Sequence, residues 1–218
     1  MILYGSSLSP YVRKVLAFAA EKGIELELQP SGKAPGQPSE EFIAASPLRK
    51  MPALRDGDFT LADSSAIIAY LEARFPEPAM IPADPQERGR VIWFEEFADT
   101  SLVSCGGKMF FNRIVAPVFL GRAGDEEIAM AAETQEMPPL LDYLETVVPD
   151  AGGFLVGDRL TLADIAIASP FANFVHLKCE RDTARHGRLY AYVDAILERP
   201  SFKPWVERES ALLAKMAA

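Results

Sequence analysis

The spacing of apolar residues changes once along the chain, and this change limits the folds that are available. Up to about Phe75, short alternating segments are interleaved with helical ones, in the order strand, helix, strand, short helix, hairpin, helix. Beyond about Gln86 every strong pattern repeats at helical spacing. The proline-rich stretch "FPEPAMIPADP" separates the two parts and is typical of a linker. The sequence therefore predicts an α/β domain followed by an all-helical domain.

The first part is punctuated clearly enough to place its elements. "MILY" predicts a strand, and "IELEL" alternates apolar and charged residues as a half-buried strand does. "PSGKAPGQPSE" predicts a loop, and Asp56-Gly57 predicts the turn of a hairpin. Helices are predicted in three places: from Pro10 to the stop at Gly23, from Glu40 to Ala45, and from Ser64 to Arg74.

One stretch of the second part, "TLADIAIASPFANFVHL", is apolar nearly all round. A helix with this composition is normally buried in the middle of a bundle. Thr161 and Asp164 have the spacing of a capping box at its start, and Leu160 is placed as a hydrophobic staple. We expect this box to serve structure and not chemistry.

Charge and cysteine content exclude several classes of function. The net charge of −9 argues against non-specific nucleic-acid binding, which needs clustered basic residues. No apolar run approaches the roughly 18 residues of a membrane span, and the start lacks the pattern of a secretory signal. Two distant cysteines, Cys105 and Cys179, form neither a disulfide framework nor a zinc site, and His176 and His186 lack metal-ligand spacing. We expect a cytoplasmic protein without a metal.

The first candidate for chemistry is Ser9-Pro10, directly before the first helix. Serine is a preferred N-cap and proline is favoured at the first helical position, so capping alone explains the pair. A helix start is also an anion site, with unpaired N–H groups and partial positive charge. The hydroxyl of Ser9 could therefore donate a hydrogen bond to a bound thiolate.

The starts of a predicted strand and of a further predicted helix can likewise be explained either by local structure or by ligand binding. Met51-Pro52 stands in front of a predicted strand, where proline is tolerated. If that bond is cis, the backbone of Met51 is free to pair with a peptide-like ligand. Asp63 and Ser64 precede a helix, where capping again explains them, but they could also receive the charged end of a ligand. Three such starts together favour a binding site over three separate coincidences.

The segments "SPYVRKV", "KMPAL", "LADSSAI" and "FLVGDRLTLADIAI" together resemble the cytosolic glutathione transferase family. The resemblance implies a thioredoxin-like glutathione-binding domain over residues 1–76, a linker over 77–86, and an all-α domain over 87–218 that contributes a hydrophobic substrate pocket. The "SPY" start is similar to serine-type, tau- or zeta-like members. The resemblance further implies a homodimer, glutathione as co-substrate, and a role in detoxification.

By this resemblance, the hydroxyl of Ser9 steadies the glutathione thiolate, with Ser6 and Ser7 as rivals. Asp63 and Ser64 hold the γ-glutamyl end, and the backbone of Met51, before a cis Pro52, pairs with the cysteinyl part. Lys50 and Lys33 meet the glycine carboxylate, although solvated surface lysines are an equal alternative. The expected lining of the hydrophobic pocket is Leu8, Tyr11, Met109, Phe110 and Arg113, to which Phe171 or Trp205 could add.

The reaction class follows from the residue at position 9. A cysteine there could form a mixed disulfide, whereas a serine cannot, so conjugation of glutathione to a hydrophobic electrophile is favoured over thiol–disulfide exchange. A glutathione-dependent isomerase of the maleylacetoacetate or maleylpyruvate type, or a peroxidase, would share the same glutathione site. A non-catalytic interaction module with the same fold is the alternative from a different class.

Overall fold

The computed structural model describes residues 1–34, 36–150 and 152–216. The chain forms two compact units, Met1–Met80 and Ile81–Ala218. The boundary between these units falls inside the proline-rich stretch predicted as a linker. Within the described ranges, every helix falls short of the length and apolar character that crossing a bilayer requires.

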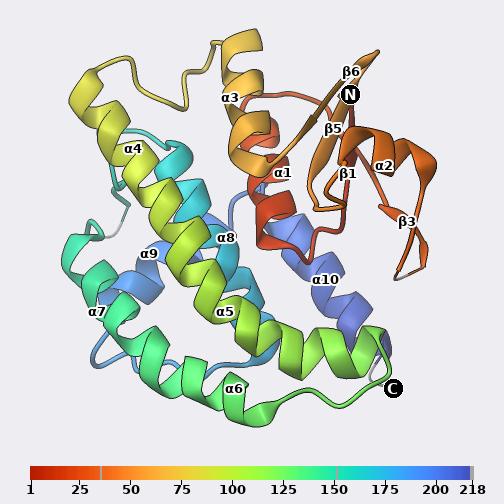
Figure 1. Cartoon of the computed structure of the whole chain (residues 1–218). Coiled ribbons are helices and arrows are strands. Elements are labelled where there is room, and N and C mark those ends of the chain that lie inside the picture. The colour runs from red at the N-terminus through yellow and green to blue at the C-terminus, as the bar shows by residue number, and fades with distance from the viewer. Residues whose placement is uncertain (35, 151, 217–218) are drawn as a thin grey trace. The chain divides into compact units, whose positions relative to one another are not determined.

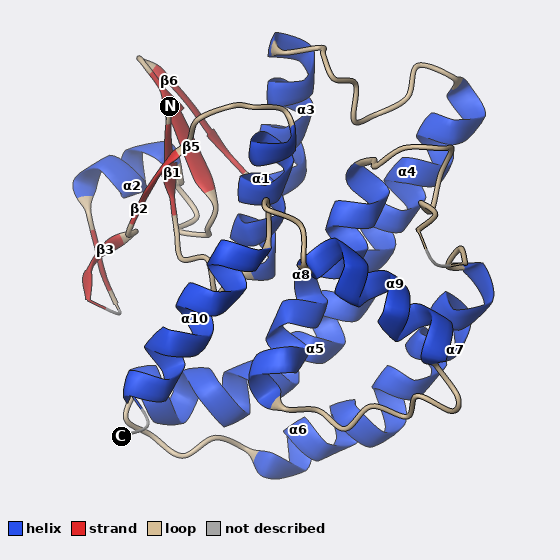
Figure 2. Ribbon diagram, turned by 180° about the vertical axis from the view of Figure 1, so that it is seen from behind, coloured by secondary structure: helices blue, strands red, loops and turns tan. Residues whose placement is uncertain are grey.

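The first unit is built on a four-stranded mixed sheet with the strand order β2-β1-β5-β6. These strands are Ile2–Tyr4 (β1), Glu27–Gln29 (β2), Ala53–Asp56 (β5) and Phe59–Ala62 (β6). β1 pairs in parallel with β2 and antiparallel with β5, which pairs antiparallel with β6. Helices α1 (Pro10–Glu21) and α3 (Ser64–Arg74) lie on one side of the sheet and α2 (Glu40–Ala45) on the other (Figure 2). This is the predicted thioredoxin-like arrangement.

Two predictions for this unit need correction. "IELEL" was expected to be a strand throughout, but β2 covers only Glu27–Gln29, because β1 is three residues long and pairs residue for residue with it. "PSGKAPGQPSE" was expected to be a loop, but it contains the short hairpin of β3 (Gly32–Ala34) and β4 (Gln37–Pro38). Pro35 of that stretch lies outside the described residues.

A glycine links the first strand to the first helix. Gly5 has a φ of +154°, and a Cβ built on it would lie 2.6 Å from Cγ2 of Val12 and 3.4 Å from Cβ of Met51. A larger residue would therefore clash at this point, which only glycine can occupy without strain. The close approach brings the end of β1, the first helix and the segment before β5 together.

The second unit is all-helical, as predicted. Its elements are α4 (Pro85–Phe97), α5 (Val103–Phe110), α6 (Glu126–Ala131), α7 (Met137–Val147), α8 (Leu162–Leu177), α9 (Gly187–Leu197) and α10 (Lys203–Met216). Three π-helical turns, η1 (Ala98–Leu102), η2 (Phe111–Phe119) and η3 (Ala132–Glu136), continue α4 into α5, extend α5, and join α6 to α7 (Figure 1). Pro138 and Pro139, which lack N–H donors, lie in the first turn of α7, just after η3.

Helix α8 forms the centre of this unit and packs against α4, α5 and α9. All residues from Leu162 to Phe174 are buried, which confirms the prediction from the apolar pattern. The predicted capping box is also present: the side chain of Thr161 accepts from a backbone N–H in the first turn, and Asp164 accepts from the N–H of Thr161 at 2.8 Å. Leu160, the expected staple, is buried beside it.

Candidate glutathione site

Three chain segments meet at one edge of the sheet in the first unit. Tyr4 pairs with Ala53 and Ala53 pairs with Ala62, so the end of β1, the start of β5 and the end of β6 lie side by side. The segments that leave this edge carry the three predicted starts: Ser9-Pro10, Met51-Pro52 and Asp63-Ser64. The topology therefore brings together residues that are far apart in the sequence.

Ser9 occupies the N-cap position of α1, and Pro10 is the first helical residue. The backbone of Ser9 is fixed, because its N–H donates to the carbonyl of Ser6 and its carbonyl accepts from the N–H of Arg13, both at 2.9 Å. Its side chain makes no capping bond, and no other described residue is its hydrogen-bond partner. The hydroxyl therefore stands at the positive end of the helix without a structural role.

The peptide bond between Met51 and Pro52 is cis, as expected. Met51 lies outside the sheet, whose first pair on β5 is Ala53 with Tyr4. In the described chain, no backbone hydrogen bond occupies the N–H or carbonyl of Met51. The side chain of Ser46 instead ties down the preceding residue, accepting from the N–H of Lys50 at 3.0 Å and donating to its carbonyl at 2.7 Å. The backbone of Met51 is thus held in place but left available.

Asp63 is the N-cap of α3 and has an unusual backbone conformation, with φ +82° and ψ 132°. Its Oδ1 accepts from the N–H groups of Ser65 and Ala66, at 3.0 and 3.1 Å. Both capping bonds use the same oxygen, so Oδ2 has no partner among the described residues. Such a conformation costs on the order of 1–3 kcal/mol in a residue other than glycine, and strain of this kind gathers at functional sites. No residue pattern around Asp63 predicts this strain.

The remaining predicted residues of this unit fall in less constrained places. Ser64 is buried at the start of α3, whereas Lys33 in β3 and Lys50 before β5 are exposed. The carbonyl of Ser6 is used by Ser9, and Ser7 lies between Ser6 and the helix. The two predicted pocket residues Leu8 and Tyr11 stand on either side of Ser9-Pro10.

In the second unit, the predicted pocket residues lie on α5 and η2. Met109 is fully buried and lines a cavity of the helical unit, as does Phe171 of α8. Phe110 follows Met109 on α5, and Trp205 lies in α10. Arg113 is held by two carboxylates, since it donates to Glu126 at 2.6 Å and to Glu133 at 2.6 Å. These ion pairs were not anticipated from the sequence.

Neither cysteine has the character of a nucleophile. Burial raises the pKa of the Cys105 thiol to about 11, and burial together with the negative charge of Glu133 raises that of Cys179 to about 12. Both thiols are therefore protonated at neutral pH, and Cys105 donates to the carbonyl of Ala132 at 3.3 Å. Chemistry that needs a thiolate must take it from a ligand.

The two histidines are paired with acids inside the helical unit. Nε2 of His176 lies 2.8 Å from Glu209, and Nε2 of His186 lies 2.9 Å from Asp142. Across residues 1–34, 36–150 and 152–216, no group of three or more His, Cys, Asp or Glu side chains is arranged to hold a metal ion.

Comparison with family models matches both parts of the chain. Residues 3–79 match the model "Glutathione S-transferase, N-terminal domain", and residues 110–209 match "Glutathione S-transferase, C-terminal domain". The first match contains all three starts that meet at the sheet edge.

Individual glutathione S-transferases of other organisms are also similar to this chain. The chain is 33% identical over 180 residues to glutathione S-transferase theta-3 of Mus musculus, covering 82% of this chain and 74% of that protein. It is 29% identical over 213 residues to a glutathione S-transferase of Hyoscyamus muticus, covering 95% and 98%.

Solved structures give the same answer. The chain matches human glutathione-S-transferase T1-1 with a TM-score of 0.82 and 28% identity, covering 99% of this chain and 90% of that one. It also matches an enzyme of Methylobacterium radiotolerans in complex with glutathione sulfonate, with a TM-score of 0.76, 28% identity and coverage of 94% and 93%. On these matches, the chain belongs to the glutathione S-transferase family.

Proposed function

We propose that this protein is a glutathione transferase that stabilises the glutathione thiolate with the hydroxyl of Ser9 and conjugates it to a hydrophobic electrophile. The observation that carries the proposal is the unused hydroxyl at the N-terminus of α1, on a backbone fixed at both its N–H and its carbonyl. A residue that only capped the helix would spend its side chain on the helix's own N–H groups.

The expected stabilisation is large enough for the chemistry. Lowering a thiol pKa from about 8.5 by roughly 2 units requires about 2.7 kcal/mol. A hydrogen bond to a charged group supplies about 1.5–3 kcal/mol. The field at the helix start adds about 0.3–1 kcal/mol, or up to about 2 when the site is partly buried. Ser9 therefore acts as a hydrogen-bond donor, and no cationic catalytic residue is required.

The rest of glutathione is assigned to the two other starts. The backbone of Met51, before cis Pro52, pairs with the cysteinyl part, and Oδ2 of Asp63 receives the γ-glutamyl ammonium, with Ser64 beside its carboxylate. Support comes from the free backbone of Met51 and from both caps of α3 using Oδ1. Lys50 and Lys33 remain our proposal for the glycine carboxylate.

The electrophile is proposed to contact Leu8, Tyr11, Met109, Phe110 and Arg113. The names of the relatives favour conjugation over the isomerase, the peroxidase and the non-catalytic module. The serine-type assignment follows from the role proposed for Ser9. Within the family, the tau- or zeta-like resemblance is confined to the N-terminal motif, whereas several curated relatives are theta-named.

We further propose a cytoplasmic homodimer that serves detoxification, with domains over residues 1–76 and 87–218. An exposed aromatic group on α4 and α7 supports the homodimer. Trp93 is 55% exposed and donates to the hydroxyl of Tyr143 at 3.1 Å, and Phe97 packs against both rings. Exposed aromatic surface of this kind is enriched at interfaces between subunits.

The proposal is tested by titrating the thiol of bound glutathione by its ultraviolet absorbance. In the parent protein we expect a pKa roughly 2 units below that of free glutathione. Ser9→Ala should return the pKa most of the way to the free value, whereas Ser6→Ala and Ser7→Ala should leave it unchanged. A bound thiol that ionises no more readily than free glutathione would rule out the mechanism.

A further inference from the structure

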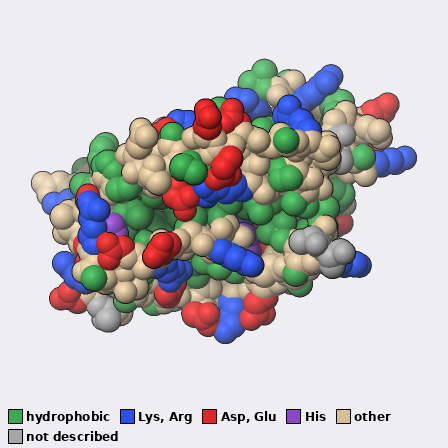
Figure 3. Space-filling model, turned by 90° about the horizontal axis from the view of Figure 1, so that it is seen from below, with side chains coloured by type: hydrophobic (Ala, Val, Ile, Leu, Met, Phe, Trp, Pro, Cys, Tyr) green, Lys and Arg blue, Asp and Glu red, His purple; other side chains and the backbone are tan. Residues whose placement is uncertain are grey.

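The helical unit contains a cavity of about 380 Å³. Of the residues to which the proposed function assigns a role, only Met109 lines it. It lies among α5, η3, α7, α8, α9 and the segment between α8 and α9. On the face of the molecule seen in Figure 3, apolar side chains are flanked by acidic and basic ones. Because a water molecule takes roughly 30 Å³, the cavity has room for a ligand of about a dozen heavy atoms.

The floor of the cavity is apolar and polarisable. It is formed by side chains of Met, Leu, Phe and Tyr: Met109, Met137, Leu141, Phe171, Phe174 and Tyr190. The rings of Phe171 and Phe174 meet edge to face with centroids 5.1 Å apart. Aromatic faces and methionine sulfur atoms suit a flat apolar body, and aromatic faces also attract organic cations.

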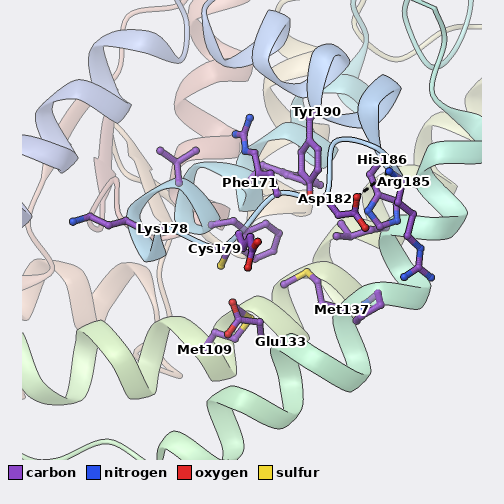
Figure 4. Close-up of a pocket in the computed structure, with 16 residues that line it drawn as sticks. Met109, Glu133, Met137, Phe171, Lys178, Cys179, Asp182, Arg185, His186 and Tyr190 are labelled. Atoms are coloured by element: carbon purple, nitrogen blue, oxygen red, sulfur yellow. Dashed lines mark hydrogen bonds between the residues drawn. The ribbon is translucent and has the colours of Figure 1, made fainter.

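A negative charge that is only partly compensated stands at one end of the cavity. The carboxylate of Glu133 points toward the cavity beside the sulfur of Cys179 (Figure 4). Glu133 shares the single guanidinium of Arg113 with Glu126, so two carboxylates are balanced by one cation. The Cys179 thiol, whose pKa burial and Glu133 raise to about 12, adds no further charge.

Two basic residues of the lining are paired with carboxylates that do not line the cavity, and one of them, Arg181, also lies over the ring of Tyr190 at 5.0 Å. Arg181 is paired with Asp194 at 2.8 Å and Arg185 with Asp142 at 2.6 Å. In Figure 4 the side chains of Lys178 and Arg185 extend away from the cavity. Of these charged groups, the Glu133 carboxylate points toward the cavity and the ammonium of Lys178 points away from it.

A buried imidazole nitrogen without a partner lies elsewhere in the lining. His186 lines the cavity and is only 3% exposed. Its Nε2 donates to Asp142, because that carboxylate, whose pKa this bond lowers, can only accept. In the Nε2–H tautomer Nδ1 is an acceptor, and it is buried without a partner in the described chain. A buried acceptor without a partner is costly unless a ligand supplies the donor.

We propose that this cavity binds a small organic cation, a protonated amine on an aromatic body with a second N–H or O–H donor, at a site separate from glutathione. The ammonium group pairs with Glu133, the aromatic body packs on the Met and Phe side chains, and the second donor turns toward His186. None of the residues that we assign to glutathione lines the cavity, and of the proposed electrophile contacts Met109 does.

Tryptamine is a suitable probe, because it carries an ammonium group, an indole ring and an indole N–H. Isothermal titration calorimetry on the full chain should show saturable binding with one site per chain. The matched anion, indole-3-propionate, should bind roughly tenfold more weakly or not at all. Equal or tighter binding of the anion would overturn the proposal.

Two substitutions separate the cavity carboxylate from its neighbour. Glu133→Gln should weaken tryptamine binding by roughly tenfold, because a charge-assisted bond becomes a neutral one. Glu126→Gln removes the same charge from the same guanidinium, but Glu126 does not line the cavity, so the loss should be less than about threefold. Thermal melting checks that both variants are folded. Equal losses would contradict the role of Glu133.

The location is tested by filling the cavity. Val175 lines it and is 39% exposed, so Val175→Trp should abolish tryptamine binding without disturbing the core. Leu212→Trp, at a residue of α10 that is 43% exposed and outside the lining, is the matched control and should bind normally.

Saturating S-hexylglutathione should leave tryptamine affinity unchanged. Competition between the two would place the cation in the electrophile site and overturn the separate site. Ser9→Ala should also bind tryptamine normally, so failure of the catalytic proposal and failure of this one are distinguishable.

Discussion

The helix starts at Ser9 and at Thr161 look alike in the sequence and differ in the structure. Both carry a hydroxyl residue at the N-cap. Thr161 spends its side chain on the first turn of α8, and Asp164 accepts from the N–H of Thr161 in return. Ser9 makes no capping bond to α1. Of these two hydroxyls, the one in the closed capping box serves the structure of its helix, and the one without a reciprocal carboxylate is not used by its helix.

The α3 start lies between these two extremes. Asp63 caps its helix through Oδ1 alone and keeps Oδ2 open, on a strained backbone. One residue therefore combines the structural role of Thr161 with the availability of Ser9. The three starts form a series in which structural use of the side chain falls as availability to a ligand rises.

The largest effect on stability is expected at the start of α8, where Thr161 and Asp164 form a closed capping box. Asp164→Ala removes the acceptor of four donors: the N–H groups of Leu155 and Thr161, both at 2.8 Å, the hydroxyl of Thr161 at 3.3 Å and the hydroxyl of Tyr192 at 2.6 Å. Each buried donor left unpaired costs about 1–3 kcal/mol, so the free energy of unfolding should fall by about 3 kcal/mol or more. Urea unfolding measures it. Thr161→Ser, which keeps the hydroxyl, should cost far less, and a comparable loss there would show that the network is not what holds the start.

Ser9→Ala should have the opposite effects, with little loss of stability and a large loss of catalytic rate. Because no capping bond is lost, the free energy of unfolding should change by less than about 0.5 kcal/mol. The rate of conjugation should fall roughly 10- to 100-fold, since the bond to the charged sulfur is worth about 1.5–3 kcal/mol, while glutathione affinity changes little. Steady-state kinetics with an aryl halide, alongside urea unfolding, checks both parts. A stable variant with the parent rate would leave Ser9 without a role.

The same series explains how far the sequence could predict this molecule. The element order, the buried α8 and its capping box followed from apolar spacing and cap residues, because these depend on local chemistry. The positions of the three starts followed as well. Whether each side chain is used by its own helix did not, because that depends on rotamers and on φ, as the +82° at Asp63 shows.

The helical cavity was also beyond reach from the sequence. It joins Glu133 on η3 to Cys179 and His186 in the segment between α8 and α9, and η3 meets this segment only through the packing of the helices. Met109 and Phe171 were singled out as pocket residues, but their spacing is equally typical of core. No short-range pattern distinguished the two.

Asp63→Ala should give an intermediate result in both measurements. Loss of the cap should cost about 1 kcal/mol of unfolding free energy, and glutathione affinity should fall roughly tenfold as the ammonium group loses its partner. Asp63→Asn keeps a capping oxygen and tolerates positive φ, so it should recover the stability but not the affinity. Calorimetry with glutathione and urea unfolding separate the two. If Asp63→Asn bound glutathione as tightly as the parent protein does, the charge of Asp63 would not be used in binding.

The smallest effect is the pH dependence of the stability that Asp164 contributes at the start of α8. Burial raises the pKa of Asp164 above 3.8, against the lowering effect of its hydrogen bonds to Tyr192, Leu155 and Thr161. Between 3.8 and the raised pKa, the native state binds more protons at this carboxyl than the unfolded state does. The stability contributed by Asp164 therefore grows as the pH falls through that window and declines as the pH rises. Asp164→Asn has no such proton, so the difference in unfolding free energy, parent minus variant, should increase on acidification. If this difference instead stayed flat or shrank toward low pH, the hydrogen bonds to Asp164, and not its burial, would dominate its pKa. The start of α8 would then favour a charged group, as we propose for the thiolate at Ser9.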